Sequence, residues 1–239
     1  MDCQVQLSYD AVMANANAPA TAKGRAMRER IVQAAAELIA EKGVAAMSLD
    51  DVRSRTGASR SQLYHYFDNR DDLVHAVIDV TTDVVLNNQG ELLYELDSWA
   101  GIDRWFDALV QHQIDRQGCG GCPIGVLVGQ LAERDRDARA ALAAGLNRWE
   151  AHVRDGLTRM RARGKLRKDA DPAALATATM ASIQGGLLLT QVRRDPHQLR
   201  IALNAARNNL RAARAVGSTP QARLRSSVED DRRSLRRRK

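Results

Sequence analysis

Apolar residues recur at helical spacing along most of this chain, and no segment shows the alternating pattern of a β-strand. In the segment 28–42, Ile31, Ala35, Leu38 and Ile39 follow the i, i+4, i+7, i+8 spacing of one helix face. Similar patterns predict helices over residues 71–86, 102–117, 124–134, 137–163, 171–194 and 195–216, with a break at 97–101. The chain is therefore predicted to be all-α.

Residues 48–70 predict two short helices joined by a tight turn. Ser48 suits the N-cap of the first helix, and an aspartate three positions later resembles a capping box. Gly57 ends this helix, because glycine tolerates a left-handed turn, and Ser59 caps the second helix. Leu63 and Phe67 are spaced i, i+4, so both point inward. A helix–turn–helix with a polar second helix fits the major groove of DNA, although an ordinary helical hairpin has the same spacing.

The outward face of the second short helix carries candidate DNA contacts. Because arginine pairs with guanine and glutamine with adenine, we expect contacts to base edges from Arg60, Ser61 and Gln62. We expect contacts to phosphates, which position a protein without reading sequence, from Ser48, Ser59, Tyr64, His65 and Arg70. Tyr66 is either a further phosphate donor or part of the core.

Five segments together resemble the DNA-binding domain of tetracycline-repressor (TetR) family regulators: Arg30–Ala35, Leu38–Gly43, Ser48–Val52, Thr56–Ser59 and Leu63–Phe67. The resemblance covers residues 25–78 and implies a three-helix DNA-binding unit, followed by a helix over 71–86 that transmits a ligand signal. The loop 121–125, Gly-Cys-Pro-Ile-Gly, resembles the LmrA/YxaF-like branch of the family. That branch includes repressors of multidrug-efflux and aromatic-compound genes.

The pattern and the resemblance divide the chain into four parts. We expect a disordered arm over 1–22, the helix–turn–helix domain over 23–70, a helical ligand-binding and dimerisation domain over 71–216, and a disordered basic tail over 217–239. The resemblance implies that the last two long helices dimerise as a four-helix bundle. Candidate interface residues are Leu175, Ala181, Gly185, Leu189, Leu199, Leu203 and Leu210. These faces alternatively bury in the core of one subunit, but a two-fold DNA site favours the dimer.

A ligand cavity is expected among the middle helices. Aromatic residues, a methionine and a few polar groups suit a flat apolar effector. The candidates are Trp105, Phe106, Leu109, His112, Leu127, Trp149, Met180 and Gln184. Residues at such helical spacing are individually more typical of plain core.

The loop 118–125 contains a Cys-x-x-Cys pair, Cys119 and Cys122. Such a pair is typical of a redox couple or of half a zinc site. No second pair or clustered histidines complete a zinc site, so no metal is expected. A redox role would rely on a lowered thiol pKa for Cys122 at a helix N-terminus. The alternative is that Cys122 packs as a small apolar residue and Cys119 is incidental.

Charge and composition narrow the function further. The 239 residues carry a net charge of +7, and the segment 218–239 alone contributes eight basic and three acidic residues. Net charge is therefore poor evidence for specific DNA binding, and the placement of arginines near the second short helix matters more. No apolar run approaches the roughly 18 residues that span a membrane, and no secretory signal is recognisable. With three cysteines and no disulfide framework, the protein is expected in the cytoplasm, without a membrane partner.

These features predict a ligand-responsive repressor rather than an enzyme. The sequence offers no nucleophile elbow, no phosphate-binding glycine loop and no metal-spaced cluster, so neither catalysis nor a cofactor is expected. The expected partners are double-stranded operator DNA with a palindromic site, a small apolar or aromatic effector that releases it, and a second copy of the chain. An activator, or a nonspecific DNA-binding protein that uses the basic tail, remains the alternative.

Overall fold

The computed structural model describes residues 21–215, and within them the chain is all-helical, as predicted. The arm over 1–20 and the tail over 216–239 lie outside the described residues. The elements are α1 (Ala22–Lys42), α2 (Leu49–Thr56), α3 (Arg60–Tyr66), α4 (Arg70–Asn87), the 3-10 helix η1 (Gly90–Leu93), α5 (Trp99–Asp115), α6 (Pro123–Leu131), α7 (Arg136–Ala162), α8 (Pro172–Arg193) and α9 (His197–Ala212).

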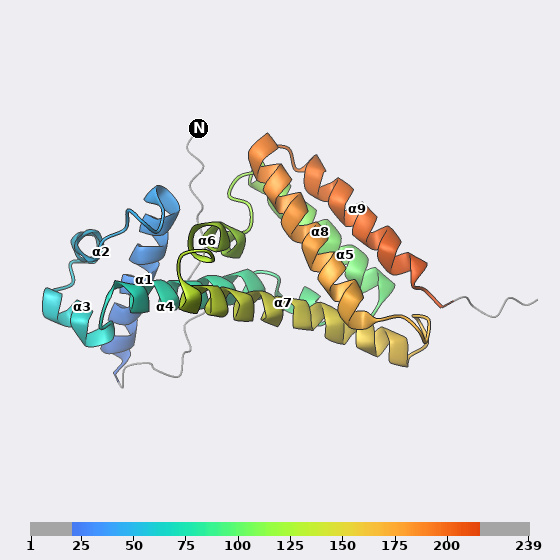
Figure 1. Cartoon of the computed structure of the whole chain (residues 1–239), viewed down its shortest axis with the longest axis horizontal. Coiled ribbons are helices and arrows are strands. Elements are labelled where there is room, and N and C mark those ends of the chain that lie inside the picture. Colours follow the sequence, from blue (N-terminus) through green and yellow to red (C-terminus); the bar gives the residue numbers. More distant parts are fainter. Residues whose placement is uncertain (1–20, 216–239) are drawn as a thin grey trace, which may run out of the picture.

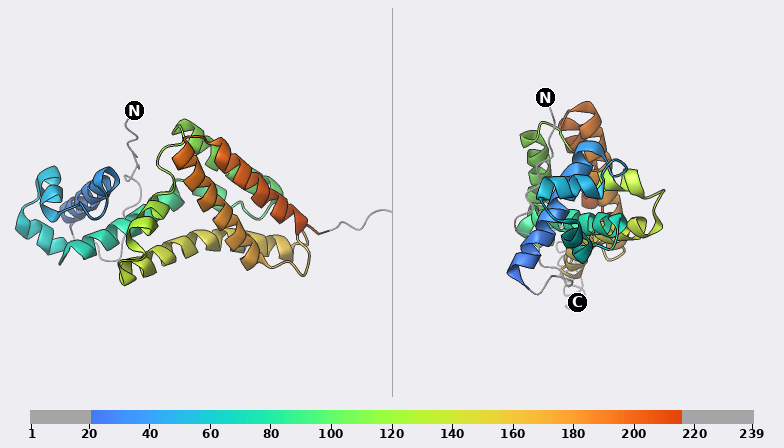
Figure 2. Two further views of the ribbon diagram at one scale, coloured as in Figure 1. Left: turned by 45° about the horizontal axis from the view of Figure 1, so that its top comes forward. Right: turned by 90° about the vertical axis from the view of Figure 1, so that its left-hand side faces the viewer.

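The molecule is elongated, with α1 to α3 at one end and α5, α8 and α9 at the other (Figures 1 and 2). Helices α4 and α7 run along the long axis and pack against each other. Helix α6 lies between the two ends and contacts both α4 and α7. The small N-terminal unit is therefore joined to the larger helical domain through α4 and α6.

The predicted turns and caps of the N-terminal unit are confirmed. Ser48 caps α2 in a full capping box with Asp51, and Gly57 ends this helix with a left-handed φ of 70°. Ser59 caps α3. Leu63 and Phe67 are 0% and 4% exposed, so the i, i+4 pair of α3 points into the core as predicted.

The structure corrects several predicted helix bounds. Helix α1 begins at Ala22 with Thr21 as its N-cap, so it reaches into the segment predicted as an arm. The expected break at 97–101 ends at Ser98, which caps α5. Gly101 therefore lies in the first turn of α5, where a Cβ would come within 1.9 Å of the Glu95 carbonyl oxygen. This glycine permits a close approach of two backbones instead of breaking the helix.

The candidate dimer residues are divided between the core and the surface. Leu199, Leu203 and Leu210 on α9 are at most 1% exposed because they pack inside the subunit, so they are not available to a partner. Leu175 on α8 is partly buried against the same core. On the opposite side of α8, exposed residues follow a three- and four-residue spacing and form an apolar stripe: Ala174, Ala178, Ala181, Gly185, Leu188 and Val192. Leu189 is exposed beside this stripe.

Helix α8 also corrects the expectation that no segment is apolar enough to cross a membrane. By length and composition alone, Pro172–Arg193 passes that test. The core helix of a globular protein passes it as well, and α8 packs between α7 and α9. Its apolar character is accounted for by one face in the core and one exposed stripe.

Candidate nucleic-acid interface and ligand cavity

Helix α3 presents a polar face on a rigidly capped helix. The Ser59 hydroxyl accepts from the Gln62 backbone N–H at 3.1 Å, and the Gln62 side-chain oxygen accepts from the Ser59 N–H at 2.9 Å. Such a reciprocal cap fixes where the helix starts. It also occupies the Gln62 oxygen, which a bidentate contact to adenine needs. Ser59 and Gln62 thus maintain the helix start.

The exposed residues of α3 are Arg60, Ser61, Gln62, Tyr64 and His65. The Arg60 guanidinium lies 5.7 Å from the centroid of the Tyr64 ring, and the Tyr64 side chain is 45% exposed. Cation–π contact at this distance limits the rotamers of the arginine while leaving its donors available. Tyr66 is only half-buried, and its ring makes an edge contact with His65 at 4.9 Å between centroids.

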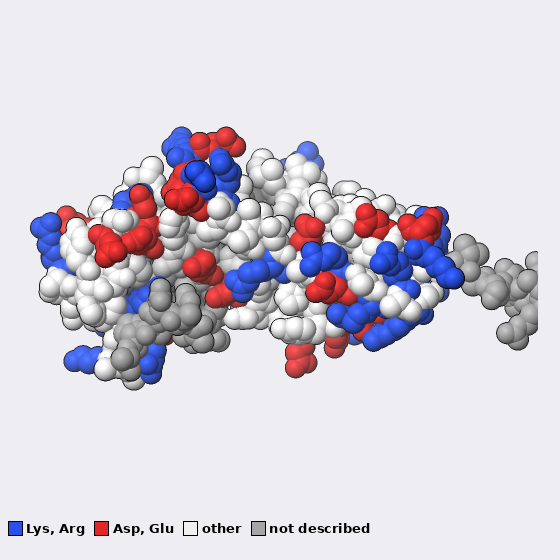
Figure 3. Space-filling model, turned by 60° about the horizontal axis from the view of Figure 1, so that its bottom comes forward, with Lys and Arg blue, Asp and Glu red and all other residues white. Residues whose placement is uncertain are grey.

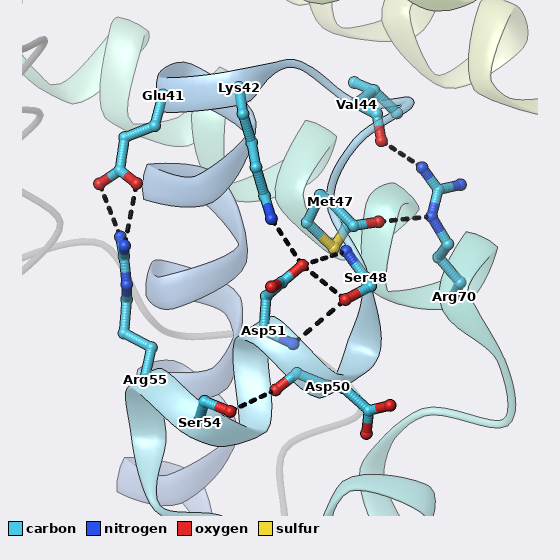
Figure 4. Close-up of polar contacts among 10 residues, drawn as sticks. All are labelled: Glu41, Lys42, Val44, Met47, Ser48, Asp50, Asp51, Ser54, Arg55 and Arg70. Carbon is cyan, nitrogen blue, oxygen red and sulfur yellow. Dashed lines mark hydrogen bonds and ion pairs between the residues drawn. The ribbon is translucent and has the colours of Figure 1, made fainter.

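Ion pairs between α1 and α2 engage basic side chains that lie close to α3 in the chain (Figure 4). Arg55 donates two hydrogen bonds to Glu41 at 2.7 and 2.9 Å, and Lys42 donates one to Asp51 at 2.6 Å. The hydrogen bond from Lys42, with the Ser48 hydrogen bonds, lowers the pKa of Asp51 to about 2. The Ser48 hydroxyl is likewise engaged with Asp51 at 2.5 Å. The pairs hold α2 on α1 and so fix the platform that carries α3.

Arg70 occupies a different place from the one predicted for it. Its guanidinium points back to the α1–α2 loop, where it donates to the carbonyl of Met47 at 3.0 Å and to that of Val44 (Figure 4). A phosphate contact from the same donors would break these bonds. Arg70 therefore fastens the start of α4 to the N-terminal unit, and the phosphate contact expected of it stays a prediction.

Positive and negative side chains alternate over the face of the molecule in Figure 3, without a single basic surface. This distribution agrees with the expectation that net charge would say little about a specific site.

A cavity of about 120 Å³ opens between α4, α5, α7 and the start of α6. Four predicted residues line it: Trp105, Leu109, His112 and Trp149. The wall also includes residues that were not predicted: Val85, Asn88, Gln89, Leu92, Ala108, Gln113, Arg116, Gly121, Cys122, Pro123 and Leu187. The other four predicted residues, Phe106, Leu127, Met180 and Gln184, do not line this cavity.

The misplaced candidates follow from helix geometry. Phe106 is 1% exposed and lies one position after Trp105, so its side chain points in another direction. Its ring faces α9, where the Arg207 guanidinium lies 5.7 Å from the ring centroid. Leu127 and Met180 are buried in the general core. Gln184 is partly exposed, yet its Nε2 is buried without a hydrogen-bond partner among the described residues.

The cavity wall combines apolar area with a few polar groups. Trp105 Nε1 donates to Gln89 Oε1 at 2.8 Å, whereas Trp149 Nε1 and Gln113 Oε1 are buried without partners among the described residues. Burial lowers the pKa of His112, and the neighbouring Arg116 lowers it further. Burial also lowers the pKa of Arg116. Unpaired buried polar atoms carry a desolvation cost that a bound molecule would relieve.

The glycine-rich loop before α6 has a structural role. Gly118 and Gly121 adopt left-handed φ angles of 70° and 56°. A Cβ on Gly121 would lie 2.4 Å from the movable Gln191 side-chain oxygen of α8, so it is mainly the left-handed φ that favours glycine there. These glycines bring the start of α6 to the edge of the cavity.

The environment of Cys122 does not support the redox alternative. This residue is a buried free thiol, so it is not bonded to Cys119, and burial raises the pKa of its thiol instead of lowering it. A protonated thiol is a poor nucleophile. Among the described residues, no group of three or more potential ligands is arranged to hold a metal ion. Cys122 packs as a small apolar residue at the N-cap of α6.

Helix α6 connects the cavity with the N-terminal unit. Its first residues, Cys122 and Pro123, line the cavity. Near its other end, Gln130 accepts a hydrogen bond from the Val44 backbone N–H at 2.6 Å, in the α1–α2 loop. Arg70 binds the Val44 carbonyl from α4. The loop that precedes α2 is therefore held from both helices that reach the larger domain.

Comparison with known proteins gives matches over both parts of the chain. A family model described as "Bacterial regulatory proteins, tetR family" matches residues 31–77, and "Tetracyclin repressor-like, C-terminal domain" matches residues 99–206. An uncharacterized HTH-type transcriptional regulator of Mycobacterium tuberculosis is 32% identical over 198 residues, which cover 77% of this chain and 94% of the relative. One in the lacX 3' region of Lactococcus lactis is 31% identical over 175 residues, 72% of this chain and 86% of the relative.

Solved structures match the fold over most of the chain. The crystal structure of a TetR transcriptional regulator from Chloroflexus aurantiacus gives a TM-score of 0.69 at 22% identity. The match covers 82% of this chain and all of that one.

Proposed function

Because this chain belongs to the tetR family of bacterial regulatory proteins, which act in transcription and are not enzymes, we propose that it is a repressor. It binds a palindromic operator as a homodimer and is released by a small effector. The observation that carries this proposal is α3, a helix with a reciprocal cap, a buried Leu63 and an exposed polar face. A protein that binds genomic DNA works in the cytoplasm.

We assign fewer residues to DNA than the sequence alone suggests, and exposure and hydrogen bonding support this choice. We place Arg60 and Ser61 at base edges, because both are exposed at the start of α3 and arginine pairs bidentately with guanine. Tyr64 and His65 contact phosphates. Ser48, Ser59, Gln62 and Arg70 set the position of α3 through caps and loop contacts, and the half-buried Tyr66 supports His65.

A second copy of the chain covers the apolar stripe of α8. Its small residues Ala178, Ala181 and Gly185 permit close helix approach, and Leu188 and Val192 add apolar area. Val192 is 74% exposed and Leu188 is 60% exposed in the single subunit. A large exposed apolar patch typically marks an interaction site, and a two-fold interface matches two half-sites on DNA.

The effector occupies the cavity and acts through α6 and α4. A ligand that binds one arrangement of the helices better than another shifts the population toward it. Because Cys122 and Pro123 line the cavity and Gln130 holds the α1–α2 loop, a shift of α6 changes the position of the N-terminal unit. The two α3 helices then lose the spacing of the half-sites.

Two relatives support the finer parts of this proposal. Over 76 residues, which cover 30% of this chain and 41% of the relative, it is 26% identical to the icaADBC negative transcriptional regulator IcaR of Staphylococcus aureus. It is 24% identical over 170 residues to the regulator YxaF of Bacillus subtilis, 70% of this chain and 86% of the relative. With the negative regulator as support, we propose that this chain represses transcription. With YxaF as support, we propose that it belongs to the LmrA/YxaF-like branch.

Footprinting on the DNA that flanks the gene tests the proposal. At near-physiological salt, we expect a protected palindrome that disappears with Arg60→Ala and with Tyr64→Ala. Arg104→Ala is the matched control, because Arg104 pairs with Glu95 on the far domain, and its footprint should persist. Smooth, salt-sensitive coating without a palindrome would favour a nonspecific binder, and lower reporter expression in a deletion strain would favour an activator.

A charged side chain placed on the apolar stripe of α8 tests whether this stripe forms the dimer interface. A Cβ on Gly185 meets nothing within 4 Å in the single subunit, so Gly185→Arg should fold yet sediment as a monomer and lose the palindromic footprint. Gly129→Arg is the control, because Gly129 also faces open space but lies on α6. A dimeric Gly185→Arg protein would move the interface away from α8.

A further inference from the structure

The cavity wall carries positive charge without an acidic residue. Among its fifteen lining residues, Arg116 is the one fixed cation, and none is aspartate or glutamate. No carboxylate lies within ion-pair distance of Arg116 in residues 21–215. Its guanidinium lies 3.4 Å from the His112 Nε2 atom. Arg116 is intermediate in exposure and a guanidinium carries five N–H donors, so this side chain has capacity for an anion.

The end of α5 does not supply that missing partner. Arg116 is the C-cap residue of α5, where a cation interacts favourably with the last carbonyl groups. Three of these carbonyls already accept backbone hydrogen bonds: His112 from Arg116, Gln113 from Gly118, and Ile114 from Gln117. They therefore offer the guanidinium little further hydrogen bonding.

The remainder of the wall specifies the body of the ligand. Leu92, Leu109 and Trp105 provide apolar area next to the charged end. Trp149 Nε1 adds a donor, and Gln113 Oε1 an acceptor, that have no hydrogen-bond partner within residues 21–215. The volume of about 120 Å³ is close to that of engineered cavities that hold one benzene-sized molecule. His112 is mainly uncharged at neutral pH because its pKa is lowered, so the wall presents one positive charge.

We propose that the effector is a small organic monocarboxylate with an apolar body, and that Arg116 binds its carboxylate inside this cavity. This inference rests on the proposed function and specifies the chemistry of its ligand. Arginine matches a carboxylate with two parallel N–H···O bonds, so it distinguishes the acid from its neutral amide. The apolar wall limits the size of the body.

Binding of paired acid and amide probes to the full chain, without DNA, tests the proposal. The probes are benzoate against benzamide, and aliphatic carboxylates of two to eight carbons against their amides. Binding is followed by the fluorescence of Trp105 and Trp149, which line the cavity, and by calorimetry. We expect at least one acid to bind tenfold or more tightly than its amide. Arg116→Gln should remove that preference while leaving the affinity for the amide within about twofold.

Two further variants keep the outcome interpretable. Arg104→Gln, which removes an arginine from the same helix but outside the cavity, should keep the preference for the acid. If Arg116→Gln fails to fold by circular dichroism, Arg116→Lys decides, because it should retain a preference for acids. Any of three results overturns the proposal. These are amides that bind as tightly as acids, a preference for acids that survives loss of the Arg116 charge, and no binding by any acid at 10 mM concentration. Because DNA is absent, this result is independent of the footprint.

Discussion

The hydrogen bond between Val44 and Gln130 gives the sharpest test of how the two parts of the molecule communicate. It joins the α1–α2 loop to α6 at 2.6 Å, across 86 positions in the sequence. Replacing Gln130 with methionine keeps the length of the side chain but removes the acceptor. Val44 is 4% exposed, so its N–H has little access to water as a substitute partner.

The size of the effect follows from the cost of one hydrogen bond. Leaving the buried Val44 N–H without an acceptor costs about 1–3 kcal/mol, which corresponds to a factor of about 5 to 160 in an equilibrium. If α6 transmits the effector signal through this bond, the coupling between effector and DNA should fall by up to that factor in Gln130→Met. The remaining coupling passes through α4 and Arg70.

The assay compares DNA affinity with and without the tightest-binding carboxylate from the probe series, and the ratio of the two affinities measures the coupling. Gln111→Met is the matched control, since Gln111 makes its hydrogen bond to Asp115 within α5 and is exposed. We expect its ratio to equal that of the unmodified protein. A Gln130→Met ratio unchanged within the error of the measurement would refute transmission through α6.

Three further predictions concern stability and reactivity. Gly156→Ala should lower the free energy of unfolding by about 1–3 kcal/mol in urea titrations, because the added Cβ lies 2.6 Å from the Leu96 carbonyl oxygen; Gly129→Ala, in open space, should instead raise it by up to about 1 kcal/mol. The pKa of Asp51 is lowered to about 2 from its usual 3.8, so its contribution to stability is present above about pH 4 and is lost as the pH falls toward 2. Asp51→Asn should show a smaller loss of melting temperature over that window, and equal losses would count against the ion pair. Cys122 should resist iodoacetamide at pH 7 until the protein unfolds, and rapid alkylation of the native protein at this residue would contradict its burial.

Local sequence signals were sufficient for the N-terminal unit. Ser48, Gly57 and Ser59 determine their own turns, because caps and left-handed glycines act within four residues of the chain. The inward pair Leu63 and Phe67 follows from helical spacing alone. What spacing does not give is the destination of a long polar side chain. Arg70 follows α3, which makes a phosphate contact the simplest expectation, and spacing does not reveal that two carbonyls in the α1–α2 loop lie within its reach.

The larger domain shows where periodicity stops being informative. The pattern identified α9 as amphipathic, and both a dimer face and a core face satisfy that pattern. The burial of Leu199, Leu203 and Leu210 results from α9 packing on α8 and α5, which depends on the tertiary arrangement. The same applies to Leu127 and Met180, which are apolar but lie away from the cavity.

One signal in the sequence would have identified Arg116 before the structure. Trp105, Leu109, His112 and Arg116 follow each other at spacings of four, three and four, so they share one face of α5, and all four line the cavity. A charged residue that continues an aromatic and apolar face is unusual on a helix that packs into a core. By contrast, Gln130 sits on a helix whose sequence gives no indication of a long-range partner. The charge that selects the ligand is thus encoded locally, whereas the contact that transmits its binding depends on how two distant segments meet.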